Sequence, residues 1–264
     1  MSGRPARDVT QLHVSYSQIH TYLICPEKFR QQYVASRPPS HRSGDLVFGS
    51  AVHGALARYH AHLMESGEKP PLDEVKREFD ALWDIEQGDG APVLWEDAET
   101  PDKLVERGHN LLALYHETHT PRRVLAVERS FTLPAGTLGG NQEEAIVGAV
   151  DLVEEDKDGT VYITELKTAG RRYDDIRLQH DLQLSVYAAA RVALGFPDAR
   201  LRFRVLLKTK RPGIETYDVR REEEQLAEMR TVVTQVLRAI DHGIYYPLRS
   251  WACAGCAFRS TCGK

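Results

Sequence analysis

The chain has 264 residues, of which 42% are hydrophobic and 27% are charged, and its formal net charge is −4. This length allows one large domain or two small ones, and the composition is that of an ordinary globular protein. The first residues lack the apolar core of a secretory signal, and no stretch approaches the roughly 18 consecutive apolar residues that span a bilayer. We therefore expect a cytoplasmic protein with no membrane partner.

The negative charge is concentrated in one segment. Residues 65–106 contain fourteen Asp and Glu against four Lys and Arg, a balance of −10, so the rest of the chain carries +6 within the total of −4. A basic surface is expected elsewhere, and this distribution does not exclude nucleic acid as a partner.

The amino-terminal part is predicted to be helical. Residues 15–34 indicate two short helices broken at Cys25-Pro26, with Ser15 and Ser17 as candidate N-caps. Further helices are expected over residues 48–64, 72–87 and 101–119, with a Gly- and Pro-containing loop at 88–92 between the last two.

After Pro121 the apolar period changes to two, which predicts strands over 123–133, 145–155 and 160–168. The second and third are joined at "DKDGT", which is typical of a hairpin. A long helix over 174–194, strands in "RLRFRVLLKT" and "IETYDV", a helix over 221–242 and a cysteine-containing tail follow. This order predicts an α/β core, at about 121–220, with an acidic helical insertion at about 65–120.

The hairpin carries Asp151, Glu165 and Lys167. If its loop has three residues and a left-handed Gly159, Asp151 lies opposite Glu165, with Cβ atoms about 4.5–5.5 Å apart. A two-residue loop shifts the register by one and separates the two carboxylates. The geometry is therefore a hypothesis.

Two interpretations of these charges stay open from the residues alone. One is a solvated hairpin with scattered charges. The other follows from the apolar residues around them, which indicate central strands, where charges need partners or a metal. Carboxylate oxygens are ligands for Mg²⁺ or Mn²⁺, and a lysine can orient the attacking water. The second interpretation predicts metal-assisted hydrolysis.

A basic stretch lies between Arg200 and Arg211, with six Lys and Arg and no acidic residue. It is either a solvated edge or a wall that contacts phosphates. The candidate DNA-contacting residues are Arg171, Arg172, Arg200, Arg202, Arg204, Lys208, Lys210 and Arg211.

Three of the four cysteines, Cys253, Cys256 and Cys262, lie in the last twelve residues. Two thiolates in C-x-x-C with a third nearby are normal in zinc and iron–sulfur sites, and the fourth ligand is then Cys25 or a histidine. Chemistry alone does not choose between zinc and iron–sulfur. Four free cysteines are the remaining alternative.

Several motifs resemble the PD-(D/E)XK nuclease superfamily, in particular its RecB-like branch. "GAVD" followed by "TELKT" resembles the nuclease signature, "GSAVHGAL" the helical motif with a histidine, and "QLSVYAAA" the Q-x-x-x-Y motif. Residues 15–33 resemble the family's amino-terminal segment, and the C-terminal cysteines resemble those of members that bind a [4Fe–4S] cluster. The motifs occur in order from residue 15 to residue 262. Relatives of this kind include CRISPR-associated adaptation nucleases and phage exonucleases.

The resemblance implies a restriction-endonuclease-like fold, with a mixed central sheet flanked by helices, in a single domain over 1–264. It implies Mn²⁺ or Mg²⁺, as one or two ions, held by His53, Asp151, Glu165 and the Leu166 carbonyl. Lys167 would position the water, while Gln183 and Tyr187 would contact DNA near the scissile phosphate. Cys25, Cys253, Cys256 and Cys262 would hold the cluster, which joins the two ends of the chain as a clasp.

Some of these residues also have simpler interpretations. His53 alone could be a surface or packing residue, Tyr187 a core residue, and Glu128 a second acid near the metal. No P-loop motif is present, so we expect no nucleotide cofactor.

The function expected from the resemblance is a metal-dependent DNA exonuclease acting on ends or single strands, in recombination, repair or DNA degradation. The alternatives are a CRISPR-type spacer-trimming nuclease or endonuclease, and a catalytically idle Fe–S DNA-binding subunit. A homo-oligomer or ring around DNA stays open, because no self-association surface is identifiable in the sequence.

Overall fold

The computed structural model describes residues 13–88, 90–95, 100–134, 136 and 145–262. Of the predicted acidic segment, Asp89, Glu96, Asp97 and Glu99 lie outside these residues, as does part of the predicted 88–92 loop. In the described part, no helix has the length and apolar character needed to cross a membrane.

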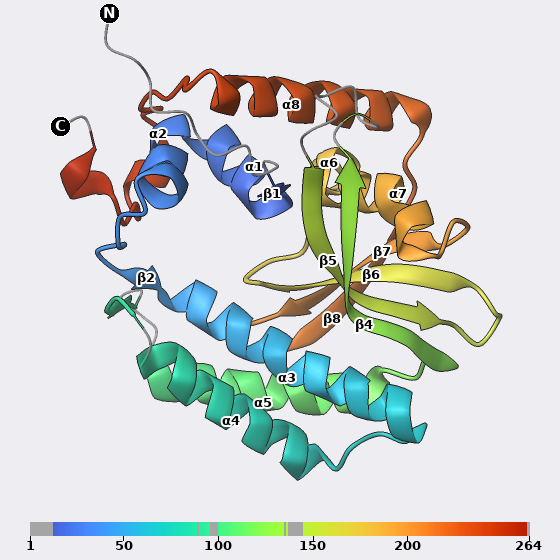
Figure 1. Cartoon of the computed structure of the whole chain (residues 1–264). Coiled ribbons are helices and arrows are strands. Elements are labelled where there is room, and N and C mark those ends of the chain that lie inside the picture. Colours follow the sequence, from blue (N-terminus) through green and yellow to red (C-terminus); the bar gives the residue numbers. More distant parts are fainter. Residues whose placement is uncertain (1–12, 89, 96–99, 135, 137–144, 263–264) are drawn as a thin grey trace, which may run out of the picture.

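A six-stranded mixed sheet forms the centre of the described chain (Figure 1). Its spatial order is β1 (His13–Ser15), β5 (Ala145–Glu155), β6 (Val161–Ala169), β7 (Arg200–Leu207) and β8 (Gly213–Val219), with β4 (Arg123–Pro134) paired to β5. The β1–β5 and β6–β7 pairs are parallel, and β4–β5, β5–β6 and β7–β8 are antiparallel. The predicted α/β core with a mixed sheet is confirmed.

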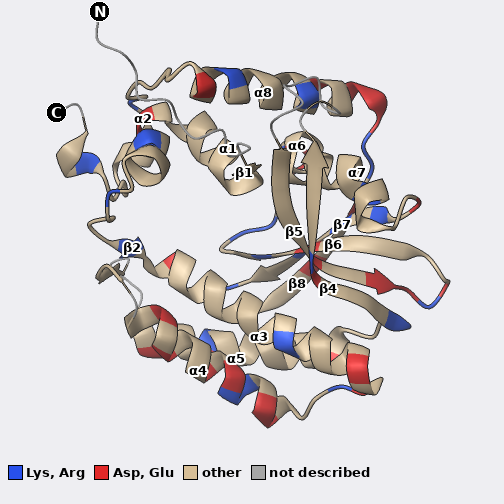
Figure 2. Ribbon diagram, viewed as in Figure 1, with Lys and Arg blue, Asp and Glu red and all other residues tan. Residues whose placement is uncertain are grey.

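Helices cover both faces of the sheet, and each face has its own apolar core (Figure 1). On one face lie α1 (Tyr16–Ile24), α7 (Leu182–Leu194) and α8 (Glu223–Asp241), which bury side chains such as Ile19, Val186 and Met229. On the other lie α3 (Gly44–Ser66), α4 (Leu72–Gly88) and α5 (Pro101–Thr118), packed on Leu166 and Leu206 of the sheet. Figure 2 shows acidic residues gathered on α4, within the predicted acidic segment.

Shorter elements connect these layers. They are α2 (Pro26–Phe29), a π-helical turn at Arg30–Val34, β2 (Arg42–Ser43) paired with β3 (Val93–Leu94), α6 (Asp175–His180), and 3₁₀ turns at Trp251–Cys253 and Arg259–Thr261. The predicted break at Cys25-Pro26 is confirmed, because Pro26 opens α2 and Cys25 is extended.

The β5–β6 hairpin has the register that a three-residue loop requires. Leu152 pairs with Thr164 and Val153 with Ile163, and the backbone of Asp156 donates to Thr160 at 2.9 Å. Gly159 closes the turn with φ +85°, a left-handed conformation that glycine adopts without a Cβ penalty. The same register, continued by one residue, sets Asp151 against Glu165.

Two predictions of element boundaries were wrong, and three short strands were not predicted. The helix expected over 174–194 is two helices, because Asp181 is extended between them and its side chain caps α7 at Leu184 N with 3.1 Å. The helix expected from residue 48 begins at Gly44, where the Ser43 hydroxyl caps the Leu46 N–H. The short strands β1, β2 and β3 were not predicted, since each has only two or three residues.

Candidate active site

The candidate site lies where β5 loses its strand partner on one side. Along this edge β1 pairs with residues 145–147 of β5, and β6 pairs with residues 152–155. In the described residues, no strand pairs with residues 148–151 on that side. Instead the backbone N–H of Leu166 donates to Oδ2 of Asp151 at 2.7 Å, so the side chain takes the place of a ladder hydrogen bond.

Glu165 is the most enclosed acid of the site, with 2% of its surface exposed. Nζ of Lys167 lies 2.6 Å from its Oε1, and Nε2 of Gln183 donates to the same oxygen at 2.7 Å. The hydroxyl of Tyr187 donates to Oε2 at 2.7 Å. Both carboxylate oxygens are therefore held in place by side chains of β6 and α7.

Helix α7 contributes Gln183 and Tyr187 as a linked pair. They are four residues apart and so share a face, and Nε2 of Gln183 donates to the Tyr187 hydroxyl at 3.0 Å. The amide oxygen of Gln183 accepts from Lys167 Nζ at 2.9 Å, so Gln183 bridges the lysine and the carboxylate. The Tyr187 hydroxyl also lies 2.9 Å from the Ala149 carbonyl, on the unpaired part of β5.

Gly148 makes room for this pair. It faces Phe131 across the β4–β5 ladder, and a Cβ at residue 148 would lie 2.8 Å from the Phe131 ring. That ring packs edge-on against Tyr187, with centroids 6.0 Å apart. The glycine of "GAVD" thus allows Phe131 to support Tyr187.

His53 reaches the site from α3, on the opposite face of the sheet. Its Nδ1 lies 3.7 Å from Oδ2 of Asp151, the same oxygen that accepts from the Leu166 N–H. Burial, reinforced by the charge of Lys167 and opposed by that of Glu165, lowers the pKa of His53. The imidazole is therefore neutral near pH 7, the form that binds metal ions.

The carboxylates of the site repel each other. Burial and the charge of Glu165 raise the pKa of Asp151 well above its usual value, although the Leu166 N–H and Lys167 oppose this. For Lys167, burial disfavours the charge, but the contacts with Glu165 and Asp151 outweigh it and raise the pKa. An added cation would relieve the excess negative charge.

Glu128 lies on β4, across the β4–β5 ladder from Asp151. It lies between Val127, paired with Leu152, and Arg129, paired with Val150, and hence across from Asp151. Its φ of +46° is rare for a residue with a side chain and costs of order 1–3 kcal/mol. Partial burial of its carboxyl group and the charge of Glu165 raise the pKa of Glu128. Its predicted place near the acids is thus observed, while its role stays a prediction.

The donor atoms suit a divalent cation of the Mg²⁺ or Mn²⁺ kind. Two carboxylates, one imidazole and the Leu166 backbone meet at one strand edge, and oxygen with nitrogen ligands is the set these ions accept. Among the residues that the structure describes, however, no three His, Cys, Asp or Glu are spaced to hold a metal ion as they stand. Closer approach of His53 to the acids would accompany binding.

The predicted phosphate wall needs correction at two positions. Arg202 is 7% exposed and is held by Asp218 at 2.7 Å and Asp156 at 3.0 Å. Arg204 is 8% exposed and pairs with Glu154 at 2.7 Å. Neither guanidinium faces solvent, because Arg202 packs over the Tyr162 ring and Arg204 donates to the Tyr115 hydroxyl of α5.

Five of the other predicted DNA-contacting residues are exposed, whereas the Lys208 side chain is largely buried. Arg172 pairs with Glu215 at 2.6 Å while remaining 75% exposed, and Lys208 contacts Asp45 on α3. The side chains that are exposed are those of Arg171, Arg172, Arg200, Lys210 and Arg211. Their contact with DNA stays a prediction.

A buried polar network next to the site was missed by sequence reasoning. Glu154, fully buried, accepts from Arg204 at 2.7 Å, from Thr164 at 2.9 Å and lies 2.8 Å from Nε2 of His119. Burial by itself raises the pKa of Glu154, but the contacts with His119 and Arg204 outweigh burial and lower the pKa. The only signal in the sequence was Glu154 itself, a second acid on the other face of β5 from Asp151. Sequence reasoning could not find its partners, because His119 and Arg204 lie far from it in the chain.

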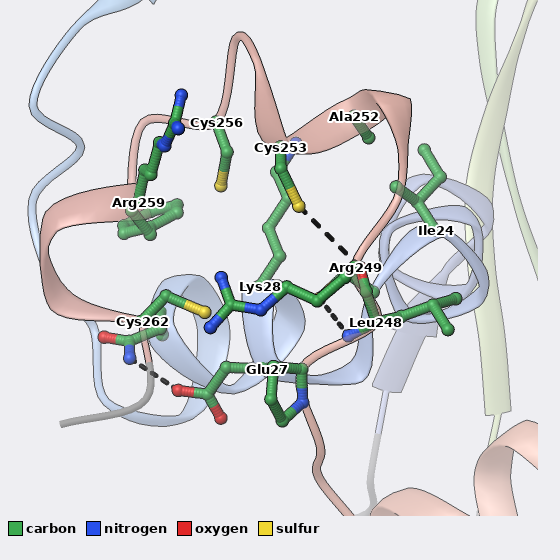
Figure 3. Close-up of a pocket in the computed structure, with 14 residues that line it drawn as sticks. Ile24, Glu27, Lys28, Leu248, Arg249, Ala252, Cys253, Cys256, Arg259 and Cys262 are labelled. Carbon is green, nitrogen blue, oxygen red and sulfur yellow. Dashed lines mark hydrogen bonds between the residues drawn. The ribbon is translucent and has the colours of Figure 1, made fainter.

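The four cysteines come together at the two ends of the chain. All of them line one pocket, together with Lys28, Arg249 and Arg259 (Figure 3). The Leu248 N–H donates to Cys25 Sγ at 3.4 Å, and the Tyr22 hydroxyl donates to the Ile244 carbonyl at 2.6 Å. The four thiols thus share one pocket with basic side chains, although among the described residues no three of them are spaced to hold a metal ion as they stand.

The fold is mixed α/β. At the edge of β5 near Asp151 it carries two acids and a lysine in an arrangement suited to hydrolysis. The chain belongs to the PD-(D/E)XK nuclease superfamily, whose sequence model matches residues 13–263. No curated protein matches the chain.

Among the solved structures that are similar to the chain are the following two. One is named "Putative exonuclease" from Eubacterium rectale, with 12% identity, a TM-score of 0.48, and coverage of 90% of this chain and 85% of that one. The other is SSO0001, with 14% identity, a TM-score of 0.38, and coverage of 94% and 98%. The family assignment rests on the sequence model alone.

Proposed function

We propose that this chain is a metal-dependent DNA exonuclease of the RecB-like branch, one domain over residues 1–264. The observation that carries the proposal is the meeting of Asp151, Glu165 and Lys167 at the unpaired edge of β5. Membership in a nuclease superfamily supports DNA as the substrate.

His53, Asp151, Glu165 and the Leu166 carbonyl would hold the Mn²⁺ or Mg²⁺. When bound, the cation supplies Lewis-acid stabilisation of the phosphate oxygens and activates water for attack. Because imidazole suits Mn²⁺ better than Mg²⁺, we expect faster cleavage in manganese. Equal or faster rates in magnesium would contradict His53 as a ligand.

The chain's own residues position the reacting groups. Lys167 carries its positive charge next to Glu165, where it can orient water and offset negative charge that develops on the phosphate. Gln183 holds Lys167 and Glu165 at a constant separation, and Tyr187 fixes the second oxygen of Glu165. The pair on α7 therefore acts mainly by positioning.

Cys25, Cys253, Cys256 and Cys262 would hold a [4Fe–4S] cluster, with zinc as the alternative. The proposal is supported by their shared pocket and by the basic residues around it. We assign the cluster a structural role as the clasp between α1–α2 and the tail, because a bond that closes so long a loop restricts the unfolded chain.

The test is cleavage of end-labelled single- and double-stranded DNA in Mn²⁺ by wild type, Glu165→Ala and the exposed control Glu224→Ala. We expect stepwise shortening from an end by wild type and the control, and none by Glu165→Ala. Equal cleavage by all three proteins would contradict the assigned site. Labels at the 5′ and the 3′ end report the polarity, and cutting of circular single strands would indicate an endonuclease instead.

A further inference from the structure

Helix α1 presents two side chains that the core does not use. Ile19 and Tyr22 of this helix are buried in the apolar core, whereas Tyr16 is half-buried and His20 is exposed. The two rings lie four residues apart, on one face, with centroids 5.7 Å apart. In the described part of the chain, no hydrogen-bond partner is present for the Tyr16 hydroxyl or the His20 imidazole.

The start of α1 is tied to the strand that carries Asp151. Ser15 belongs to β1 and pairs with Val147 of β5. It also caps α1 reciprocally, since Ser15 Oγ accepts from Gln18 N at 3.3 Å and Gln18 Oε1 accepts from Ser15 N at 2.7 Å. Tyr16 follows directly and is therefore held in a constant position relative to the unpaired edge of β5.

Tyr16 begins α1 next to β5, four residues before Asp151 on that strand, because its neighbour Ser15 pairs with Val147. Burial and the nearby charges of Asp181 and Glu165 raise the pKa of Tyr16, while Arg177 opposes them. Arg177 is itself stacked over the Tyr173 ring, with its Cζ 3.6 Å from the centroid. Tyr16 thus contributes an aromatic ring at the start of α1, and Arg177 contributes a guanidinium on α6.

His20 and Lys28 continue this line away from the site. His20 lies on α1 beyond Tyr16, and α2 with Lys28 follows directly after α1. Lys28 lies on α2 and lines the cysteine pocket. Among the described residues, Lys28 has no ion-pair partner, in contrast to Arg202 and Arg204, which do.

We propose that Tyr16, His20 and Lys28 form a contact strip for single-stranded DNA, leading from the catalytic edge toward the cysteine pocket. The proposal rests on the proposed nuclease function and deepens it. An unpaired base offers a free face on which Tyr16 stacks, whereas bases of a duplex are already stacked on each other. His20 and Lys28 meet the following phosphates, where an unpaired lysine gains a counter-charge.

The strip is longer than one nucleotide, so the contributions of Tyr16 and Lys28 to binding can be measured separately. Nine residues of α1 span about 14 Å at a rise of about 1.5 Å per residue. Tyr16 should therefore matter for short oligonucleotides as well as long ones, whereas Lys28 should matter only when the strand extends past His20.

The experiment measures binding, so that it does not depend on cleavage. In a Glu165→Gln background, fluorescence anisotropy with Mn²⁺ reports the affinity for dye-labelled single strands of graded length and for a blunt duplex. We expect Tyr16→Ala to bind all single strands about tenfold more weakly, as loss of one stacked base predicts. Tyr16→Phe, which keeps the ring, should bind within about twofold of the parent.

Lys28→Ala should weaken binding of the longer strands only and should reduce the salt dependence by about 0.7 in the log–log slope. Lys157→Ala, the same change at the exposed hairpin loop, should have no effect. Thermal melting of each variant checks that the fold is retained, and His20→Ala, at an exposed position, gives a second test if Tyr16→Ala melts early.

The proposal is overturned if Tyr16→Ala and Lys28→Ala bind as the parent does, if Tyr16→Phe is as weak as Tyr16→Ala, or if the variants lose duplex and single-strand binding alike. It is also overturned if the parent binds no single strand. If the parent binds single strands and wild type does not cut DNA, the strip stands and the proposed catalytic function fails.

Discussion

Asp151 and Leu166 are joined by a 2.7 Å hydrogen bond at the point where β5 and β6 stop pairing. The strands part after Leu152 and Thr164, and the carboxylate accepts the backbone N–H that would otherwise have lost its partner. A buried, unsatisfied N–H would cost about 1–3 kcal/mol, so the acid stabilises the separation of the strands as well as contributing charge. The same residue is thus structural and, in our proposal, a metal ligand.

Asp151→Asn separates these two roles. The amide oxygen can still accept from Leu166 N, while the charge that is repelled by Glu165 is removed. Because the pKa of Asp151 is raised, its ionised form is disfavoured in the fold, and we expect Asn to unfold at the same or a higher temperature. Cleavage should fall at least about 100-fold through loss of a metal ligand.

Differential scanning calorimetry and the cleavage assay check both parts. An Asp151→Asn protein that cuts DNA at the wild-type rate would remove Asp151 from the metal site. Asp84→Asn, at an exposed position on α4, is the control and should change neither quantity.

Tyr187→Phe tests the positioning role of α7. The change removes the hydroxyl that contacts Glu165 Oε2 and the Ala149 carbonyl, and leaves buried acceptors with one donor fewer. We expect a loss of about 1–2 kcal/mol in the free energy of unfolding and a fall of about tenfold in kcat with little change in KM. Chemical denaturation and steady-state kinetics measure these, with the exposed Tyr246→Phe as control. A change in KM alone would indicate substrate contact instead.

The buried histidines predict loss of stability in mild acid. Burial lowers the pKa of His60 and His119 below the ordinary value of 6.5, and their surroundings are Glu154, Arg204 and Tyr115. Below pH 6.5 the unfolded chain therefore binds protons that the folded chain does not, and the free energy of unfolding falls as pH is lowered. The limiting slope is about 1.4 kcal/mol per pH unit for each histidine.

Urea denaturation at pH values from 7.5 to about 5 measures this slope. The double variant His60→Gln/His119→Gln should show a flatter profile than wild type, although it starts from lower stability. The exposed His242→Gln should keep the wild-type slope. A double variant with an unchanged slope would show that other groups cause the acid sensitivity.

Cys256→Ala tests the clasp. We expect it to lose iron and the broad visible absorbance of a cluster, together with stability, because the tail is then held only by contacts such as that between Ser40 Oγ and the Ala257 carbonyl at 2.7 Å. Iron and zinc analysis and thermal melting give the readouts, and Ser260→Ala, exposed in the following 3₁₀ turn, is the control. A metal-free Cys256→Ala protein that is as stable as wild type would contradict the structural role of the cluster. Zinc instead of iron in the wild-type protein would show that the cysteines bind zinc rather than a [4Fe–4S] cluster.

Much of the site was predictable because its spacing is local. The three-residue loop ending in Gly159 sets the register of the hairpin, and that register brings Asp151 to Glu165 with Lys167 on the same face. Gln183 and Tyr187 are four residues apart on one helix, so their shared face also followed from the chain itself.

The errors come from elements whose neighbours lie far away in the chain. Alternation on β7 correctly put Arg202 and Arg204 on one face, but that face meets Glu154 and Tyr115 rather than solvent. The apolar periodicity of residues 174–194 predicted one continuous helix. Asp181 interrupts this helix, because an aspartate favours the N-cap over the helix interior.

The sequence by itself determined the five longer strands and the residue types of the acid–lysine set, since these depend on periods within a few residues, and it narrowed the hairpin register to a two- or a three-residue loop. Only the tertiary structure decided that β5 changes partners at residues 148–151, that α3 brings His53 to this edge from the other face, and that Cys25 joins the tail. The reason is that these contacts join segments far apart in the chain, in one case by more than two hundred residues. They depend on how the two apolar cores pack on the sheet and not on the conformational preferences of neighbouring residues.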